Sequence, residues 1–350
     1  MRRIPINELN NEMVLAKPIY QGTKLILERN ASHLTKHVKQ LENLGIFYVY
    51  VKDEWSTDIS IPDAIREETR EHCMQAVSAI FNRLKQQGNL DLSELGEVVQ
   101  SILDDIFSQD DIISCLHHIS SIDDDTMSHC INTTIYSLLI GKRKNLSKEQ
   151  LTTLAKGSIL HDVGKIDLNE TILLKASSLS PEEYSHIKEH ATFGYTLLMA
   201  NTQLPEDAKL ISLQHHERLD GSGYPSGLKG DQIHPYARIA AVADMFDALT
   251  TARCYRRSMS NQKAYQILTE DANAGKLDKN LVNLLFEHVA IYPNGIIVYL
   301  SDGTHGIVKQ QNPGQPFRPI VRIIDDTLGI NNVNLYDLDL AQHTEISIKQ

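Results

Sequence analysis

Cysteine is scarce in this sequence, and its four residues form neither a CxxC pair nor a regularly spaced set. Disulfide frameworks and cysteine-ligated zinc sites both need such spacing, so we expect neither. Free thiols are typical of a reducing compartment, which predicts a cytoplasmic protein. The sequence also lacks an apolar run of the roughly 20 residues that cross a bilayer, and its first residues lack the apolar core of a signal peptide.

Positive charge is in the minority, with 34 Lys and Arg against 45 Asp and Glu and a formal net charge of −11. A protein that binds a long nucleic acid needs a basic face, so this charge balance argues against that function. A small phosphate ligand remains compatible with it, because metal ions and a few arginines can reverse the charge locally. The length of 350 residues has room for two or three domains.

Histidine is abundant, with 15 residues, and it gathers with aspartate between residues 160 and 244. This stretch contains His161-Asp162, Gly164-Lys165, His190, His215-His216 and Asp244. Adjacent His-Asp and His-His pairs are costly in a core, because their polar atoms need partners once buried. Imidazole and carboxylate are natural ligands of Mn, Fe or Zn ions. Without cysteine among them, these residues favour a hydrolytic metal cluster over a structural zinc site.

The chain begins and ends with strand-like patterns. Residues 1–60 predict a small α/β unit, with strands at 13–20, 24–27 and 46–51 and a helix between the last two strands. We expect this unit to serve regulation or dimerisation. Residues 291–350 predict a small β appendage.

Between these ends the pattern is helical. Residues 61–118 predict a helical linker region, and its His117-His118 pair lacks an Asp or Gly-Lys companion, so we interpret it as structural. Ser147 with Gln150 predicts a capping box, and Ser180-Pro181 predicts a helix with proline at its first position. Residues 238–250 predict a buried helix that contains Asp244 and Asp247, for which a metal would be a partner.

Three sequence patterns in order carry a family resemblance: His161-Asp162 with Gly164-Lys165, then His215-His216-Glu217-Arg218, then Asp220-Gly221-Ser222-Gly223-Tyr224-Pro225. Together they resemble the HD-GYP family, a branch of the HD phosphohydrolases whose characterised members hydrolyse cyclic di-GMP. The resemblance covers residues 119–290, which we expect to be an HD-GYP catalytic domain, and is weaker in both flanking parts. It implies a mainly α fold, with an HD-type helical bundle between a small N-terminal α/β unit and a short C-terminal β appendage.

Matched residue by residue, the resemblance implies the metal ligands His129, His161, Asp162, His190, His215, His216 and Asp244. Asp162 would bridge two divalent ions, with Fe or Mn expected, and a hydroxide between the ions would attack the phosphorus. Lys165 would lie beside the scissile phosphate.

The same match assigns substrate contacts. Tyr224 would stack on the ligand or donate a hydrogen bond to it, Arg253 would hold the second phosphate, and Arg256 would hold a guanine. The family often has lysine at the position of Arg256. Surface pairing with nearby acids is the alternative role for both arginines.

One departure from the family pattern leaves the number of ions open. Many members have an aromatic residue four positions before the first histidine, whereas a subset has Glu there and holds three metals. This chain has Asp125, which would either ligate a third ion or cap the helix that follows.

The expected function is a metal-dependent phosphodiesterase that converts cyclic di-GMP to pGpG, with further cleavage to GMP left open. Two alternatives stand beside it: a cyclic-dinucleotide sensor with weak catalysis, and a phosphodiesterase for a mixed cyclic GMP-AMP. For the N-terminal unit we expect a second copy of the chain or a signalling protein as the partner.

Overall fold

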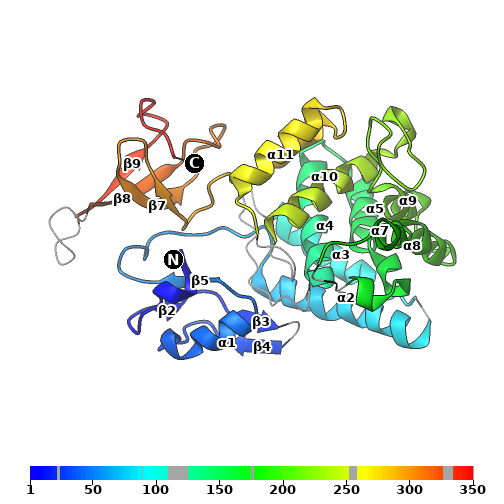
Figure 1. The fold of residues 1–350 in the computed structure, drawn as a ribbon, viewed down its shortest axis with the longest axis horizontal. Helices are drawn as coiled ribbons and strands as arrows, with labels where there is room; N and C mark the ends of the chain where they lie inside the picture. Colours follow the sequence, from blue (N-terminus) through cyan, green and yellow to red (C-terminus); the bar gives the residue numbers. More distant parts are fainter. Residues whose placement is uncertain are drawn as a thin grey trace. The chain divides into compact units, whose positions relative to one another are not determined.

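The computed structural model describes residues 1–21, 24–88, 90–108, 125–173, 175, 177–251, 258–325 and 334–349, with only the backbone of Asp125 (Figure 1). The described residues fall into two compact units. The first, which we call the β-rich unit, joins Met1–Asp63 with Phe286–Gln350. The second, which we call the helical unit, comprises Ala64–Asp110 and Asp124–Leu285.

The N-terminal part of the β-rich unit is built around one strand that is buried on both faces. The elements of this part are β1 (Arg2–Pro5), η1 (Ile6–Glu8), β2 (Val14–Leu15), β3 (Ile19–Gln21), β4 (Lys24–Leu27), η2 (Leu34–His37), α1 (Val38–Asn43) and β5 (Tyr48–Lys52). β5 pairs antiparallel with β1 on one side and β2 on the other. Because side chains alternate along a strand, Val49 and Val51 pack into the N-terminal core, while Tyr50 packs with Ile61 and Ala290.

The strand expected at 13–20 is divided in the structure. Its first residues form β2 and pair with β5, whereas β3 begins after Pro18 and pairs with β4. Proline cannot donate a hydrogen bond to a neighbouring strand, which explains why the pairing changes partner here.

The C-terminal part of the β-rich unit is a four-stranded antiparallel sheet in the order β6-β7-β8-β9. Its strands are β6 (Ile297–Tyr299), β7 (His305–Gln310), β8 (Ile320–Asp325) and β9 (Asn334–Asp339). Ile307 and Ile324 of this sheet form a small core with Ile59 of the N-terminal part. The appendage expected from the sequence is therefore a sheet that packs on the N-terminal segment.

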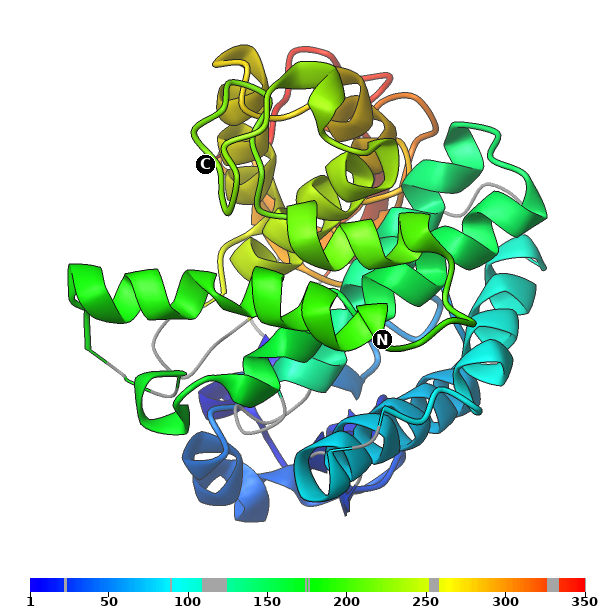
Figure 2. The same cartoon turned by 90° about the vertical axis from the view of Figure 1, so that its right-hand side faces the viewer.

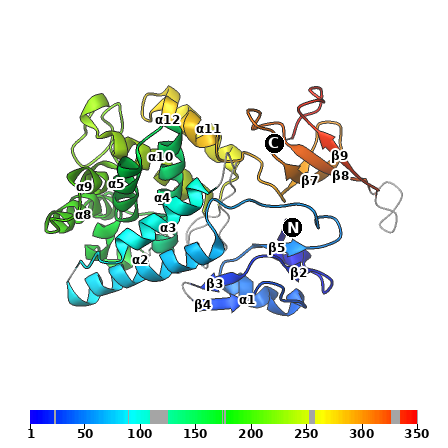
Figure 3. The ribbon, with the colours of Figure 1, turned by 180° about the vertical axis from the view of Figure 1, so that it is seen from behind.

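The helical unit contains all the residues of the predicted metal cluster. Its helices are α2 (Glu67–Gln87), α3 (Leu95–Phe107), α4 (Asp125–Arg143), α5 (Lys148–Ile159), η4 (Val163–Asp167), α6 (Glu170–Leu173), α7 (Pro181–Lys188), α8 (His190–Met199), α9 (Glu206–Gln214), η5 (Gly230–Gln232), α10 (Pro235–Thr250) and α11 (Asn261–Asn273), followed by α12 (Lys279–Phe286). Figure 2 turns this unit toward the viewer, and Figures 1 and 3 both show α2 and α3 side by side.

Local sequence sets where several of these helices begin. The predicted capping box of Ser147 and Gln150 starts α5, and Ser180 with Glu183 forms another before Pro181 of α7. In the core, Tyr136 of α4 meets Phe246 of α10 edge to face, with ring centroids 4.9 Å apart.

A glycine contact joins η4 to α8 beneath the predicted site. A Cβ atom on Gly164 would lie 2.0 Å from the His190 carbonyl oxygen and 2.3 Å from the Gly194 amide nitrogen. Only glycine therefore allows the two backbones to approach this closely. The contact holds the segment after His161-Asp162 against the first turn of the helix that carries His190.

The predicted fold class is confirmed: in chain order, small N-terminal sheets are followed by a mainly helical HD domain and then by a C-terminal antiparallel sheet. The four-part division of the chain stays a prediction. Across the ranges that the structure describes, no helix combines the length and apolar character needed to cross a membrane.

Candidate metal centre

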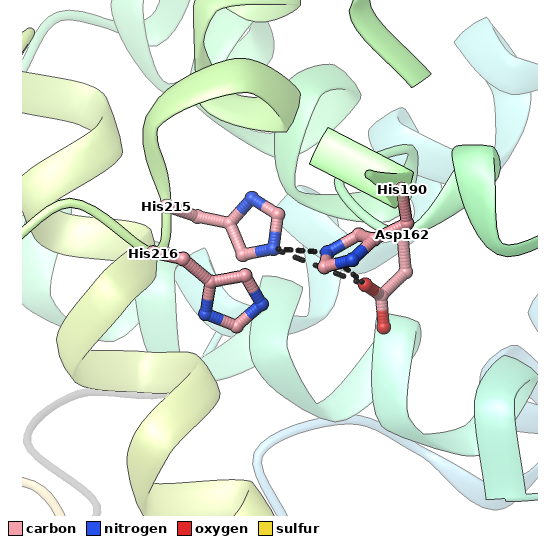
Figure 4. A group of neighbouring side chains, drawn as sticks. All are labelled: Asp162, His190, His215 and His216. Carbon is pink, nitrogen blue, oxygen red and sulfur yellow. Dashed lines mark hydrogen bonds and ion pairs between the residues drawn. The ribbon is translucent and has the colours of Figure 1, made fainter. Parts of the chain in front are cut away.

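The predicted ligands form two groups inside the helical unit, the first of them built from residues at helix ends. Asp162 follows α5, His190 begins α8, and His215-His216 follow α9. These residues form the first group, whose possible ligand atoms all lie within 4.8 Å of one another (Figure 4). His129 of α4, His161 and Asp244 of α10 form the second group under the same distance limit.

Asp162 lies between the two groups and turns one carboxylate oxygen toward each. Its Oδ1 is 3.5 Å from His190 Nε2 and 3.8 Å from His215 Nε2. Its Oδ2 is 3.4 Å from His161 Nε2 and 3.7 Å from His129 Nε2. The side chain is 1% exposed, so both oxygens face protein atoms and not bulk water. This is the arrangement that a carboxylate needs to bridge two cations.

Backbone carbonyls orient three of the histidine rings. The Nδ1 atom of His161 lies 2.7 Å from the Ser158 carbonyl oxygen, and that of His190 lies 2.7 Å from the Ile187 carbonyl oxygen. His215 Nδ1 lies 3.0 Å from the carbonyl oxygens of Ile211 and Ser212. A carbonyl oxygen only accepts, so each Nδ1 carries the proton and each Nε2 presents its lone pair to the site.

These lone pairs leave buried polar atoms without a protein donor, and a bound cation would satisfy them. Nε2 of His190 and Nε2 of His215 face each other at 3.3 Å, although neither carries a proton to share. Two ligands on one metal ion lie roughly 3.0–3.4 Å apart when each metal–nitrogen distance is about 2.0–2.1 Å. His161 Nε2 and Asp162 Oδ1 are also buried without a hydrogen-bond partner. The residues present therefore fit a pair of divalent ions.

Burial keeps most of these histidines neutral. It lowers the pKa of His215 to about 3, helped by the neighbouring His161 and His190. Burial likewise lowers the pKa of His190, and lowers that of His216 well below its ordinary value. A neutral imidazole is the form that binds a metal ion.

The two aspartates of the site stay ionised despite their burial. Burial raises the pKa of Asp162, but the opposing charge of Lys165 is the main cause that holds the pKa well below its ordinary value. Burial also raises the pKa of Asp244, but the hydrogen bond from His129 outweighs it and is the main cause of a pKa well below the ordinary value. Both carboxylates are thus anionic ligands at neutral pH.

His129 differs from the other histidines because it lies between two carboxylates. Its Nδ1 is 2.7 Å from Asp247 Oδ2, and its Nε2 is 3.0 Å from Asp244 Oδ1. Burial lowers the pKa of His129, but the hydrogen bonds to Asp244 and Asp247 outweigh it and raise the pKa to about 9. Without metal the ring is therefore protonated, and it must lose a proton to become a ligand.

Asp247 connects the site to α2 through a buried hydrogen-bond chain. Its Oδ1 accepts from Asn132 Nδ2 and from Thr251 Oγ1, each at 3.0 Å. Asn132 Oδ1 in turn accepts from the guanidinium of Arg70 at 2.9 Å. The sequence placed Asp247 in a buried helix but did not identify Asn132 or Arg70. The spacing of Asp247 three residues after Asp244, on one helix face, is the pattern that indicates a paired role.

The loop after His216 is held by a buried carboxylate. Glu217 is 2% exposed and accepts from the backbone N–H groups of Ser226 at 2.8 Å and Leu228 at 3.0 Å. The loop places the Tyr224 ring on the His216 ring, with centroids 4.7 Å apart and planes 28° apart. The sequence alone indicates no role for Glu217. In the structure, Glu217 holds the loop that carries Tyr224, the predicted ligand contact.

Lys165, the other predicted contact beside the metals, forms an ion pair with Asp162 Oδ2. Arg253, Arg256, the Asp125 side chain and the His117-His118 pair lie outside the described residues. All predicted metal ligands other than Asp125 are thus brought together, while the predicted contacts with the second phosphate and guanine stay predictions.

Comparison with known proteins identifies two segments of the chain. Residues 117–281 match the HD domain family, and residues 297–350 match the KOW domain associated with HD domain. The first match contains every residue of the two groups described above.

Several curated proteins are similar to this chain. A cyclic di-GMP phosphodiesterase of Pseudomonas aeruginosa is 26% identical over 266 residues, covering 74% of this chain and 64% of that protein. A cyclic di-GMP phosphodiesterase response regulator of Xanthomonas campestris pv. campestris is 41% identical over 131 residues, covering 37% of this chain and 35% of its own length. The 3'3'-cGAMP-specific phosphodiesterase 1 of Vibrio cholerae is 39% identical over 156 residues, covering 44% of this chain and 35% of its own.

The chain spans less than two thirds of the length of each of these relatives. These three relatives are cyclic dinucleotide phosphodiesterases, and the family match to the HD domain covers the His/Asp groups of this chain. This chain is an HD domain protein related to the HD-GYP cyclic di-GMP phosphodiesterases.

Proposed function

We propose that this chain is a metal-dependent phosphodiesterase that hydrolyses cyclic di-GMP to pGpG. The observation that carries the proposal is Asp162, whose two oxygens face two separate groups of histidine and aspartate ligands. Similarity to cyclic di-GMP phosphodiesterases supports the substrate.

The metal ligands are proposed in two sets that share Asp162. One ion would be held by Asp162, His190, His215 and His216, and the other by Asp162, His129, His161 and Asp244. Nitrogen and oxygen donors without thiolate suit Fe or Mn. When bound, two such ions supply a hydroxide nucleophile at neutral pH and neutralise charge on the phosphoryl oxygens.

The residues around the ligands have roles of their own in the proposed reaction. Lys165 is 20% exposed at the edge of the buried cluster, where its ammonium group can hold the scissile phosphate as a point charge. The Tyr224 ring, fixed on His216, limits the position of the bound nucleotide. Arg253 and Arg256 are proposed to hold the second phosphate and a guanine.

The final product depends on Asp125. A third ion held by this carboxylate would grip the terminal phosphate of pGpG and allow a second cleavage to GMP. If Asp125 caps α4 instead, the wild type holds two ions and stops at pGpG. Elemental analysis of wild type and Asp125→Ala separates the two cases, since a third ion is lost only in the first.

Mixed cyclic GMP-AMP is the second candidate substrate, because the similarity to a 3'3'-cGAMP-specific phosphodiesterase covers 44% of the chain. A binding protein that signals without turnover is the remaining alternative. We also propose a cytoplasmic location, since Cys73 and Cys130 are buried free thiols. A second copy or a signalling protein is the proposed partner of the N-terminal segment.

One assay separates these functions. Purified protein loaded with Mn or Fe(II) is offered cyclic di-GMP and cyclic GMP-AMP separately, and the products are resolved by chromatography. We expect pGpG from cyclic di-GMP, and no hydrolysis after chelation. Faster cleavage of cyclic GMP-AMP than of cyclic di-GMP would identify cyclic GMP-AMP as the substrate. Tight binding of either ligand without any product would instead identify the chain as a sensor.

A further inference from the structure

Helix α7 places a lysine between two tyrosine rings beside the candidate metal centre. The Lys188 ammonium nitrogen lies 4.5 Å from the centroid of the Tyr184 ring and 5.3 Å from that of the Tyr224 ring. Tyr184 belongs to the same helix and is 49% exposed, whereas Tyr224 comes from the loop after His216. Both rings attract the ammonium group through their faces, which favours this position for the side chain.

Lys188 has no carboxylate partner among the described residues, although acids are close to it in sequence. Glu183 pairs with Lys175 at 2.7 Å, and Glu189 pairs with His186 at 2.7 Å. Glu182 accepts a hydrogen bond from the Ser180 hydroxyl, so none of these three acids pairs with Lys188 and its charge is left uncompensated. An uncompensated lysine held by ring faces is suited to bind an anion.

This lysine is connected to the metal centre through one aromatic ring. Tyr224 stacks on His216 at 4.7 Å and meets His190 edge to face at 6.4 Å. His190 also begins α8 two residues after Lys188, so the helix junction fixes Lys188 relative to a proposed ligand. Moving outward from the ligands, the order is therefore His216, Tyr224, Lys188 and Tyr184.

We propose that Lys188 and Tyr184 extend the site into a nucleotide-binding subsite, in which Lys188 contacts a phosphate and the Tyr184 ring stacks on a purine base. The inference rests on the proposed function and adds residues outside the metal ligands. A cyclic dinucleotide presents two bases and two phosphodiesters close together, so cleavage of one phosphodiester leaves the rest of the ligand to be held nearby. An exposed ring accepts any base by stacking, and an adjacent cation accepts the phosphate.

The experiment compares conservative and disruptive variants of both residues. Lys188→Ala and Tyr184→Leu remove the charge and the ring, while Lys188→Arg and Tyr184→Phe retain them. Two variants serve as matched controls. Lys148→Ala removes an exposed lysine at the opposite end of α5 from His161, and Tyr336→Leu removes a tyrosine that is 44% exposed on β9 of the other unit. For metal-loaded full-length protein, the Kd of cyclic di-GMP and both KM and kcat are measured.

We expect Lys188→Ala and Tyr184→Leu to raise Kd and KM about 5- to 100-fold, with kcat changed much less. Arginine and phenylalanine should restore most of the affinity, and the two controls should match wild type. Wild-type turnover with unchanged Kd and KM in both disruptive variants would overturn the subsite and leave the proposed function intact. If the wild type binds cyclic di-GMP without hydrolysing it, the proposed function is wrong, and the Kd values of the variants still test the subsite. If the wild type does not bind cyclic di-GMP at all, both the proposed function and the subsite are wrong.

Discussion

Two clusters of charged side chains in this molecule show opposite designs. In the helical unit, Asp162 and most of its histidine neighbours are buried, and two of their polar atoms, His161 Nε2 and Asp162 Oδ1, have no hydrogen-bond partner. In the β-rich unit, Asp58, Lys309, Arg322 and Asp337 form a surface network in which each charge meets opposite charges. Every charge of the surface network is paired, whereas the buried cluster has acceptor atoms that a bound cation would satisfy.

The surface network joins segments that are far apart in the sequence. Asp58 precedes the helical unit in the chain, while Lys309 and Arg322 follow it. The Arg322 guanidinium binds the Asp58 carboxylate through two nitrogens, and Lys309 adds a contact of 3.1 Å. This network therefore stabilises the packing of the C-terminal sheet on the N-terminal segment, whereas the role that we propose for the buried cluster is chemical.

The largest effect should come from Asp162→Asn, which removes the charge shared by the two ligand groups. We expect turnover of cyclic di-GMP to fall by about 10³-fold or more and bound metal to be lost, because an amide bridges two cations poorly. Activity assays and elemental analysis measure both. Asp231→Asn is the control, since this aspartate is fully exposed beside Arg238; normal turnover in Asp162→Asn would rule out the bridging role.

Asp247→Asn should have the next largest effect, because Asp247 orients His129 without facing either ion. We expect metal affinity to fall about 10- to 100-fold, with activity restored when excess metal is supplied. Metal titration of Asp247→Asn and of the control Asp271→Asn, a partly exposed aspartate that pairs with Lys276, provides the measurement. Equal affinities in these two variants would show that His129 does not depend on this hydrogen bond.

The pH dependence of the metal-free protein tests the unusual position of His129. Its folded-state pKa of about 9 lies above the ordinary value of 6.5, because Asp244 and Asp247 outweigh burial. The protonated ring therefore contributes stability that is complete below pH 6.5 and is lost as the pH rises through about 9. The midpoint of thermal unfolding in chelator should fall over this range more steeply for wild type than for His129→Gln.

His186→Gln is the control for this measurement, because its ring is only partly buried and pairs with Glu189. Metal binding should also release close to one proton at pH 7–8, since His129 must become neutral to act as a ligand. Two results together would contradict a protonated His129 ring between two carboxylates: the same pH dependence of stability in wild type and His129→Gln, and no proton release when metal binds.

The smallest effect should come from the surface network. Arg322→Ala removes the bidentate contact with Asp58, and we expect a loss of about 1 kcal/mol in the free energy of unfolding, reduced further by salt. Turnover and metal content should match wild type. Chemical denaturation at low and high salt measures the change, and a loss of activity as large as that of Asp162→Asn would erase the distinction between the clusters.

The acid response of Asp58 has the opposite sign to that of His129. Hydrogen bonds from Arg322 are the main cause that lowers the pKa of Asp58 below its ordinary value of 3.8. Its contribution is present above about pH 4 and is lost as the pH falls below that value. Wild type and Arg322→Ala should therefore converge in stability on acidification.

The same contrast explains how much could be predicted from sequence. His161-Asp162 and His215-His216 are adjacent polar pairs whose chemistry is visible without a structure, whereas their position just after α5 and α9 is known only from the structure. Asp58 and Arg322 carry no such pattern, because their pairing depends on how distant segments fold together. Lys188 was missed for a related reason: a single lysine on a helix has no meaning until the tyrosines beside it are known.

The pairing of the strands could not be predicted from the sequence either. The apolar run before Tyr20 predicts one strand, but tertiary pairing divides it between β5 and β4. Strand β9 was not predicted, since its residues gain their place by pairing with β8 along its full length. Asn132 and Arg70 are ordinary helix residues in sequence, and only the packing of α2 and α4 brings them to Asp247.

The most direct test of the account is a metal titration of metal-free protein with turnover measured at each step. Protein stripped by chelator is titrated with Mn²⁺ while hydrolysis of cyclic di-GMP is followed, and bound metal is counted at each point. We predict that turnover stays near zero until the second ion per chain binds and then rises to its full value. Full turnover with one ion per chain, or in chelator with none, would contradict a cluster in which Asp162 joins two ions.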